Sequence, residues 1–171
     1  MTITGARDAK VSDINDTLRK LDGLAKGVKY QLFDAAKVAG PHHIHYAVAN
    51  ADYAMKKGLN ISKNLDVETL LYAACENQIN KAIKVLGVSN TTDTVGVAVI
   101  SENVENKLAE AIAANLGTVD DSVLDITPEK YQFLKELYGI TETAIETVGS
   151  DRNEALTSLI AEKGALISLR R

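Results

Sequence analysis

Apolar residues recur along this chain with two spacings, one typical of helices and one typical of strands. Helical spacing predicts helices at residues 14–21, 44–55, 67–75, 79–86, 104–112, 131–138 and 155–160. Short β-prone or wholly apolar runs predict strands at residues 2–4, 29–34, 95–100 and 122–126. The run at 95–100 (VGVAVI) is apolar on both faces, which is typical of a buried central strand.

Proline, glycine and serine mark the expected boundaries of several elements. Pro41 stands where a helix should begin, and Gly58 stands where the same helix should end. Ser12 is expected to cap the first helix. The apolar tail at residues 165–169 fits either an edge strand or a docking segment.

Strands and helices alternate along the chain, which favours an α/β fold with a mixed sheet of four to five strands covered by six or seven helices. An α+β arrangement is the alternative. The length of 171 residues suits one domain over residues 1–171. Its longest apolar run is far shorter than the roughly 20 residues that span a bilayer. The N-terminus lacks the layout of a secretory signal and the one cysteine allows no internal disulfide, so we expect a cytoplasmic protein.

The formal net charge of −4 hides a basic part and an acidic part. Residues 1–64 contain ten Lys/Arg and six Asp/Glu, whereas residues 65–171 contain nine Lys/Arg and seventeen Asp/Glu. A basic region can bind a polyanion while the rest of the surface keeps the protein soluble. A solvated surface without such a partner is the alternative reading of the same charges.

All three histidines fall within four positions directly after Pro41. His42 and His45 are three residues apart and share a helix face, which is acceptable spacing for two metal ligands. A third ligand would have to come from elsewhere, and the positive end of the helix dipole disfavours a cation there. We expect the start of a helix without metal, and a small metal-dependent enzyme using His42, His45 and an acid is the alternative.

Residue patterns typical of catalysis are missing from the sequence. It contains no phosphate-binding loop of the GxxxxGK[ST] type, no GxGxxG and no GxSxG. Cys75 lies on the apolar stripe of its expected helix, so it reads as a core residue and not as a nucleophile. We therefore expect no enzymatic activity, no catalytic residue and no cofactor.

Polar and cationic side chains gather around the turn at residues 58–62 and after the first strand. The candidates for a phosphate-binding patch are Arg7, Lys10, Lys56, Lys57 and Lys63. Tyr72 is expected at the edge of its helix's apolar stripe, where its ring can stack a base. Ordinary surface charge and a half-buried core edge are the alternatives.

Eight segments spread over nearly the whole chain carry a resemblance to a known family. They are residues 5–11 (GARDAKV), 33–39 (FDAAKVA), 60–62 (NIS), 68–74 (ETLLYAA), 78–83 (QINKAI), 87–88 (GV), 121–126 (DSVLDI) and 162–167 (EKGALI). In this order and spacing they resemble the small tRNA-binding subunit of the KEOPS (EKC) complex, the PRPK-binding, TPRKB-like family in its archaeal form. Two positions depart from the family pattern: Asn77 stands where an arginine is usual, and Cys75 stands where a glycine is usual.

The resemblance implies a non-catalytic subunit of the complex that makes threonylcarbamoyladenosine in tRNA. Such a subunit binds the CCA end of tRNA and a small atypical kinase/ATPase subunit, and it presents the tRNA to the catalytic subunit. Other KEOPS subunits are then indirect partners. The family also places a histidine near His43 in some members, which puts this helix start on the RNA side. A purely structural kinase-binding regulator without RNA binding is the alternative, which Asn77 supports.

A single-stranded CCA tail is expected to be held by stacking, phosphate neutralisation and base-edge hydrogen bonds. The candidate RNA-binding residues are Arg7, Lys10, Lys56, Lys57, Asn60, Lys63, Tyr72 and Gln78, whose amide suits a base edge. The candidate kinase-binding residues are Ile79, Ile83, Leu156, Leu159 and Ile160. The last helix offers more apolar surface than its own packing needs, although full burial of that surface is the alternative.

Overall fold

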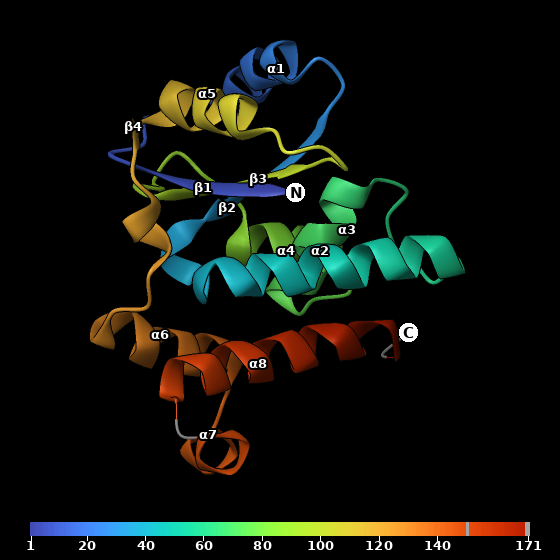
Figure 1. Cartoon of the computed structure of the whole chain (residues 1–171), viewed down its shortest axis with the longest axis vertical. Coiled ribbons are helices and arrows are strands. Elements are labelled where there is room, and N and C mark those ends of the chain that lie inside the picture. Colours follow the sequence, from blue (N-terminus) through green and yellow to red (C-terminus); the bar gives the residue numbers. More distant parts are fainter. Residues whose placement is uncertain (150, 170–171) are drawn as a thin grey trace. The chain divides into compact units, whose positions relative to one another are not determined.

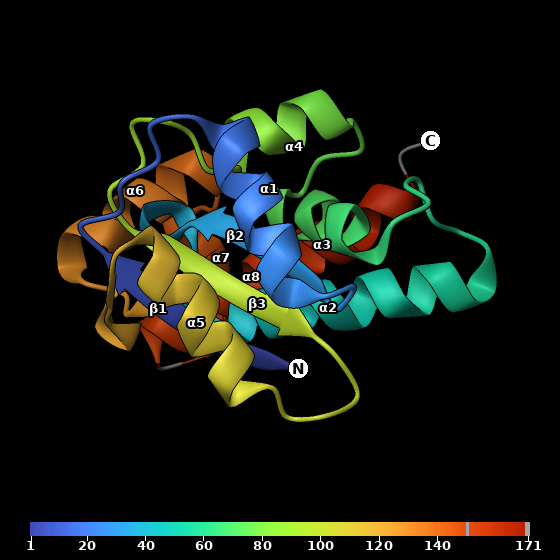
Figure 2. The same cartoon turned by 90° about the horizontal axis from the view of Figure 1, so that it is seen from above.

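The computed structural model describes residues 1–149 and 151–169, and the chain divides into two compact units. Unit 1 comprises residues 1–36 and 87–124, and unit 2 comprises residues 37–86 and 125–171. Figures 1 and 2 show the elements of each unit. Each unit is therefore built from two segments that are distant in sequence, and a single domain over residues 1–171 stays a prediction beside this division.

Unit 1 contains a four-stranded sheet in the order β2-β3-β1-β4. The strands are β1 (Thr2–Arg7), β2 (Lys29–Asp34), β3 (Val95–Ile100) and β4 (Thr118–Val119). The expected α/β class and the strands predicted at residues 29–34 and 95–100 are confirmed. The expectation of a mixed sheet is not confirmed, because every described strand pair is antiparallel.

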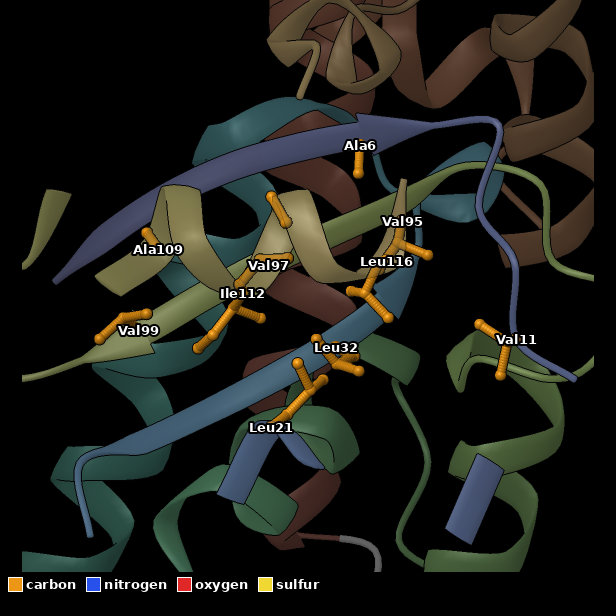
Figure 3. Close-up of a cluster of buried hydrophobic side chains, with 11 residues drawn as sticks. Ala6, Val11, Leu21, Leu32, Val95, Val97, Val99, Ala109, Ile112 and Leu116 are labelled. Atoms are coloured by element: carbon orange, nitrogen blue, oxygen red, sulfur yellow. The ribbon is translucent and has the colours of Figure 1, made fainter. Parts of the chain in front are cut away.

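The core of unit 1 lies between this sheet and two helices, α1 (Ile14–Ala25) and α5 (Asn106–Leu116). Figure 3 shows Val97 of β3 next to Ile112 of α5, and Leu21 of α1 next to Leu32 of β2. β3 is buried from Val95 to Val99, since it is paired on both edges and packed by apolar side chains. The central position expected for the run at 95–100 is therefore confirmed.

The strand predicted at residues 122–126 is wrong, because acidic side chains there bond the backbone locally. Asp121–Leu124 form a 3₁₀ turn, η2. Oδ1 of Asp120 accepts hydrogen bonds from the backbone nitrogen and the hydroxyl of Ser122, at 3.0 and 2.6 Å. Such side-chain bonds compete with strand pairing. η2 packs closely on β1, since a Cβ atom at Gly5 would lie 2.5 Å from the carbonyl oxygen of Asp120.

Unit 2 is helical in its described residues. Its helices are α2 (Gly40–Lys57), α3 (Leu65–Ala74), α4 (Ile79–Leu86), α6 (Pro128–Tyr138), α7 (Glu142–Val148) and α8 (Arg152–Ala165). Two short 3₁₀ turns are also present: η1 (Ala35–Lys37) follows β2, and η3 (Leu166–Leu169) follows α8. The tail therefore continues as helical turns, and the expectation of an edge strand at residues 165–169 is wrong. The described residues form eight α-helices, one more than the largest number predicted.

α3 is the central helix of unit 2 and packs against α2, α4 and α8. Every residue from Glu68 to Ala74 is buried, as expected of a helix with neighbours on several sides. α8 approaches α3 so closely that a Cβ atom at Gly164 would lie 2.4 Å from the carbonyl oxygen of Tyr72. Only glycine at position 164 allows the backbones of α8 and α3 to come this close.

Helix ends follow the sequence signals with two corrections. Pro41 lies in the first turn of α2, and Gly58 ends that helix with φ of 67°. The cap of α1 is Asp13 rather than Ser12, because the Asp13 side chain accepts from the backbone nitrogen of Asp16. Cys75 is not within a helix but caps the end of α3 with φ of 56°, in the left-handed region that favours glycine.

No helix within residues 1–149 and 151–169 combines the length and the apolar character that crossing a membrane requires.

Candidate nucleic-acid and partner-binding site

A buried carboxylate holds the loop between α2 and α3, residues 58–64. Glu68 of α3 is fully buried, and its Oε2 accepts hydrogen bonds from the backbone nitrogens of Ser62 at 2.6 Å and Ile61 at 3.0 Å. Its Oε1 lies 3.1 Å from the same nitrogen of Ile61. A carboxylate removed from water is stabilised by such donors. The loop, a wide turn at the end of α2 in Figure 2, therefore has a defined backbone.

Asn60, a predicted RNA contact, has a structural role in this loop. Its Nδ2 donates to the carbonyl oxygen of Ser62 at 2.9 Å, and the residue is half-buried. The hydroxyl of Ser62 accepts from the backbone nitrogen of Asn64 at 3.1 Å. These bonds fix the path of the loop, and an RNA contact by Asn60 stays a prediction.

Three predicted phosphate contacts lie together at the C-terminal end of α2 and in the loop that follows. Lys56, Lys57 and Lys63 are all exposed. Nζ of Lys56 lies 2.6 Å from Oδ2 of Asp52, and Nζ of Lys57 lies 5.9 Å from the ring centroid of Tyr53. The negative end of the helix dipole stabilises cations at this position. The arrangement can neutralise anionic groups that approach the loop.

Arg7 and Lys10, the other predicted phosphate contacts, lie in unit 1 at the end of β1. Arg7 is paired with carboxylates, with 3.2 Å from Nη1 to Oδ2 of Asp8 and 3.2 Å from Nε to Oδ2 of Asp120. Hydrogen bonds from Ser122, together with the charge of Arg7, lower the pKa of Asp120. Lys10 is exposed. A role for both residues in RNA binding stays a prediction.

The prediction that Tyr72 lies at an exposed edge of its helix is wrong. Tyr72 is only 5% exposed, because α3 is enclosed by α2, α4 and α8. Its ring is part of the core of unit 2, so no base can reach it for stacking. Burial extends around all sides of α3 from Glu68 to Ala74 and includes polar residues, which the spacing of its leucines alone does not reveal.

Gln78 lies directly before α4 and keeps an exposed side chain. Its carbonyl oxygen accepts from the backbone nitrogens of Lys81 and Ala82, both at 3.0 Å, so Gln78 starts the helix. Ile79 and Ile83, predicted kinase contacts, are 40% and 49% exposed. They are four residues apart and therefore share one face of α4. This apolar pair can contact a partner protein.

The other predicted kinase contacts lie on α8. Leu156 and Ile160 are completely buried within a cluster that includes Tyr138 and Ile145, and Leu159 is half-buried against it. The prediction of a partner surface at Leu156 and Ile160 is therefore wrong, since a partner cannot contact them while unit 2 is folded. The packing of α8 against α2, α3, α6 and α7 uses the apolar surface that looked excessive in the sequence.

His43 is buried and neutral, so its own side chain cannot contact RNA, and the expectation that this helix start lies on the RNA side stays a prediction. Its Nδ1 accepts from the backbone nitrogen of Ala39 at 3.1 Å, which leaves the proton on Nε2, 2.9 Å from the carbonyl oxygen of Ala73. The ring meets Tyr138 edge to face, with 5.6 Å between centroids. Burial, with a smaller effect of the charge of Lys130, lowers the pKa of His43 to about 4.

His42 and His45 are both exposed on α2. Across the described ranges, no group of three or more His, Cys, Asp or Glu side chains is placed to hold a metal ion. The ring of His45 instead meets Tyr46 edge to face, with 6.4 Å between centroids.

Sequence reasoning missed Tyr46 and Tyr53 on the exposed face of α2. This face carries His42, His45, Tyr46, Ala49, Tyr53, Lys56 and Lys57. Tyr46 is 43% exposed and Tyr53 is 59% exposed. Their spacing of seven residues, on the side opposite Ile44 and Ala51, was the available signal. These two rings, and not Tyr72, are accessible for stacking.

Comparison with known proteins gives two matches over most of the chain. A family model described as "Kinase binding protein CGI-121" matches residues 9–166. The chain is also similar to the "Regulatory protein Cgi121" of Methanocaldococcus jannaschii, with 32% identity over 142 residues. That alignment covers 82% of this chain and 85% of the relative.

Proposed function

Since the chain belongs to the CGI-121 family of kinase-binding proteins, the KEOPS/EKC subunit family, we propose that it is a non-catalytic adaptor within the KEOPS complex. It binds the CCA end of tRNA and the small atypical kinase/ATPase subunit. In this role it presents tRNA to the catalytic subunit that forms threonylcarbamoyladenosine.

The observation that carries the RNA part of the proposal is the loop at residues 58–64 held by Glu68. Its backbone is fixed by the buried carboxylate, and Lys57 and Lys63 are exposed beside it. A fixed loop loses little conformational freedom when it binds a flexible RNA end, which favours affinity. The exposed amide of Gln78 supplies both donors and an acceptor, so it can read a base edge.

The kinase part of the proposal rests on the family and on the exposed pair Ile79 and Ile83. A few well-packed side chains near the centre of an interface contribute most of its binding energy. Replacing Ile83 by Glu is expected to abolish co-purification with the kinase subunit. Leu24→Glu, at an equally apolar exposed position on α1, is the control that should leave it intact.

Charge reversal tests the RNA part. The double variant Lys57→Glu/Lys63→Glu is expected to bind tRNA at least tenfold more weakly. The slope of log affinity against log salt concentration should also become shallower by about two, one for each phosphate that is no longer neutralised. Lys29→Glu/Lys107→Glu, two exposed changes on β2 and α5 of unit 1, alters the net charge by the same amount and is the control. Unchanged tRNA binding by the double variant would contradict an RNA role for the loop.

A kinase-binding regulator without RNA binding is the second candidate. It is favoured by the pairing of Lys56 with Asp52 and of Arg7 with two carboxylates, since paired cations are less available to phosphates. If the protein is such a regulator, Lys57→Glu/Lys63→Glu and the unchanged protein will bind tRNA equally weakly, and both will co-purify with the kinase.

A further inference from the structure

The exposed face of α2 combines two accessible aromatic rings with cations. Tyr46 and Tyr53 lie seven residues apart, about 10 Å along the helix. Together with His42, Ala49 and Lys57 they follow the helical repeat that defines a single face, and all five residues are exposed. Ala49 stands between the two rings along the helix and has only a methyl side chain, so its side chain does not cover the space between them.

The tyrosines lie outside the buried core of unit 2. Its core receives the opposite face of α2, which includes Ile44, Ala47 and Ala51. The rings of Tyr46 and Tyr53 are therefore available for a role other than stabilising the fold.

Each tyrosine ring is positioned by a neighbour on the same helix. The ring of His45 meets Tyr46 at an interplanar angle of 82°, and Nζ of Lys57 lies 5.9 Å from the centroid of Tyr53. These contacts use one side or one edge of each ring and leave 43% of Tyr46 and 59% of Tyr53 exposed. An aromatic residue has few rotatable bonds, so a ring held in this way is available for stacking at a small entropic cost.

The charge on this face favours an anionic partner. Lys56 and Lys57 lie at its C-terminal end, and Lys63 follows in the adjoining loop. The acidic residue beside it, Asp52, is half-buried and pairs with Lys56 at 2.6 Å. Accessible aromatic rings next to lysines are the combination that holds single-stranded nucleic acid, through base stacking and phosphate neutralisation.

We infer that the exposed face of α2 binds a stretch of single-stranded RNA that continues beyond the tail held at the 58–64 loop. This inference rests on the proposed RNA binding and extends it along the helix. Bases stack on Tyr53 and then on Tyr46, while Lys57 neutralises a phosphate between the loop and the first ring. Tyr46 lies about 18 Å along the helix axis from Gly58, so it contacts only RNA longer than the terminal trinucleotide.

The test measures the affinity of the full chain for two labelled probes, a CCA trinucleotide and a longer unstructured RNA ending in CCA. Tyr46→Ala is expected to weaken binding of the longer RNA by about fivefold or more, as one base no longer stacks, and to leave the trinucleotide unaffected. Tyr46→Phe keeps the ring and should restore the affinity. Phe133→Ala removes a ring of similar exposure, 44%, from α6 and is the matched control.

The outcomes separate this inference from the function on which it rests. If the unchanged protein binds neither probe, the proposed RNA role fails and the inference fails with it. If the protein binds both probes but Tyr46→Ala and Tyr53→Ala bind the longer RNA as tightly as Phe133→Ala does, only the inference is overturned. If the two tyrosine variants no longer co-purify with the kinase but keep their full RNA affinity, the inference is likewise overturned, because α2 would then be a protein-docking face.

Discussion

The backbone nitrogen of Ser62 lies 2.6 Å from the carboxylate of Glu68, so a buried acid on α3 fixes the loop that carries Lys63. Removing this acid leaves the backbone donors of Ile61 and Ser62 without their partner. Since hydrogen bonds to a charged group contribute about 1.5–3 kcal/mol, Glu68→Ala is expected to lower the free energy of unfolding by about 2 to 3 kcal/mol. Urea denaturation measures this change.

Two further variants sharpen this test. Glu68→Gln keeps an acceptor oxygen without the charge and should lose about half as much stability. Glu110→Ala, at an exposed position on α5, should change stability by no more than about 0.5 kcal/mol. Equal stability of Glu68→Ala and the unchanged protein would show that the loop does not depend on this carboxylate.

The buried His43 makes the stability of the fold depend on pH. Its pKa is lowered from 6.5 to about 4 in the folded protein, so between these values the unfolded chain binds a proton that the folded chain does not. Stability therefore falls as the pH falls from about 6.5 to about 4, by about 3 kcal/mol for this group. Chemical denaturation of the unchanged protein and of His43→Gln over this range isolates the effect of the imidazole. Parallel curves for the two proteins would contradict it.

The left-handed backbone at Cys75 predicts an unusual order of stability among small residues. With φ of 56° at this position, Cys75→Gly should be more stable than Cys75→Ala by about 1 kcal/mol, because only glycine adopts this conformation without strain. At the neighbouring helical position, Ala74→Gly should instead destabilise by about 1 kcal/mol. Thermal unfolding of the three variants checks the order, and a Cys75→Ala variant more stable than Cys75→Gly would refute it.

Two helical glycines should respond to the same substitution in opposite ways. A Cβ atom at Gly164 would lie 2.4 Å from the carbonyl oxygen of Tyr72, so Gly164→Ala should destabilise by about 1 to 2 kcal/mol as α8 is displaced. Nothing lies within 4 Å of a Cβ atom at Gly23 of α1, so Gly23→Ala should stabilise by about 0.5 to 1 kcal/mol. Equal effects of the two substitutions in denaturation experiments would contradict the close contact of α8 with α3.

The elements that sequence reasoning located well are those whose signals are local. Pro41 and Gly58 mark the ends of α2 because one fits the first helical turn and the other adopts the left-handed conformation after the last. The run at 95–100 is recognisable as β3 because its apolar residues match burial on both faces. These features depend on a few neighbouring residues and need no knowledge of distant contacts.

The failures concern contacts between distant segments or bonds made by polar side chains. Tyr72 is buried because α8 returns to cover α3 from more than eighty residues away in sequence, as the close approach of Gly164 to Tyr72 demonstrates. Residues 121–124 form a turn because Asp120 and Asp121 bond to backbone groups, which an apolar pattern does not encode. The tyrosines of α2 lie outside its buried stripe, so the apolar pattern that locates the helix gives them no role.

The affinity of the isolated chain for one tRNA, measured with and without its terminal CCA, tests the central claim most directly. We expect markedly tighter binding when the CCA end is present, and we expect this difference to disappear in Lys57→Glu/Lys63→Glu. Equal affinity for the two tRNAs would contradict the claim that this protein recognises the end of tRNA.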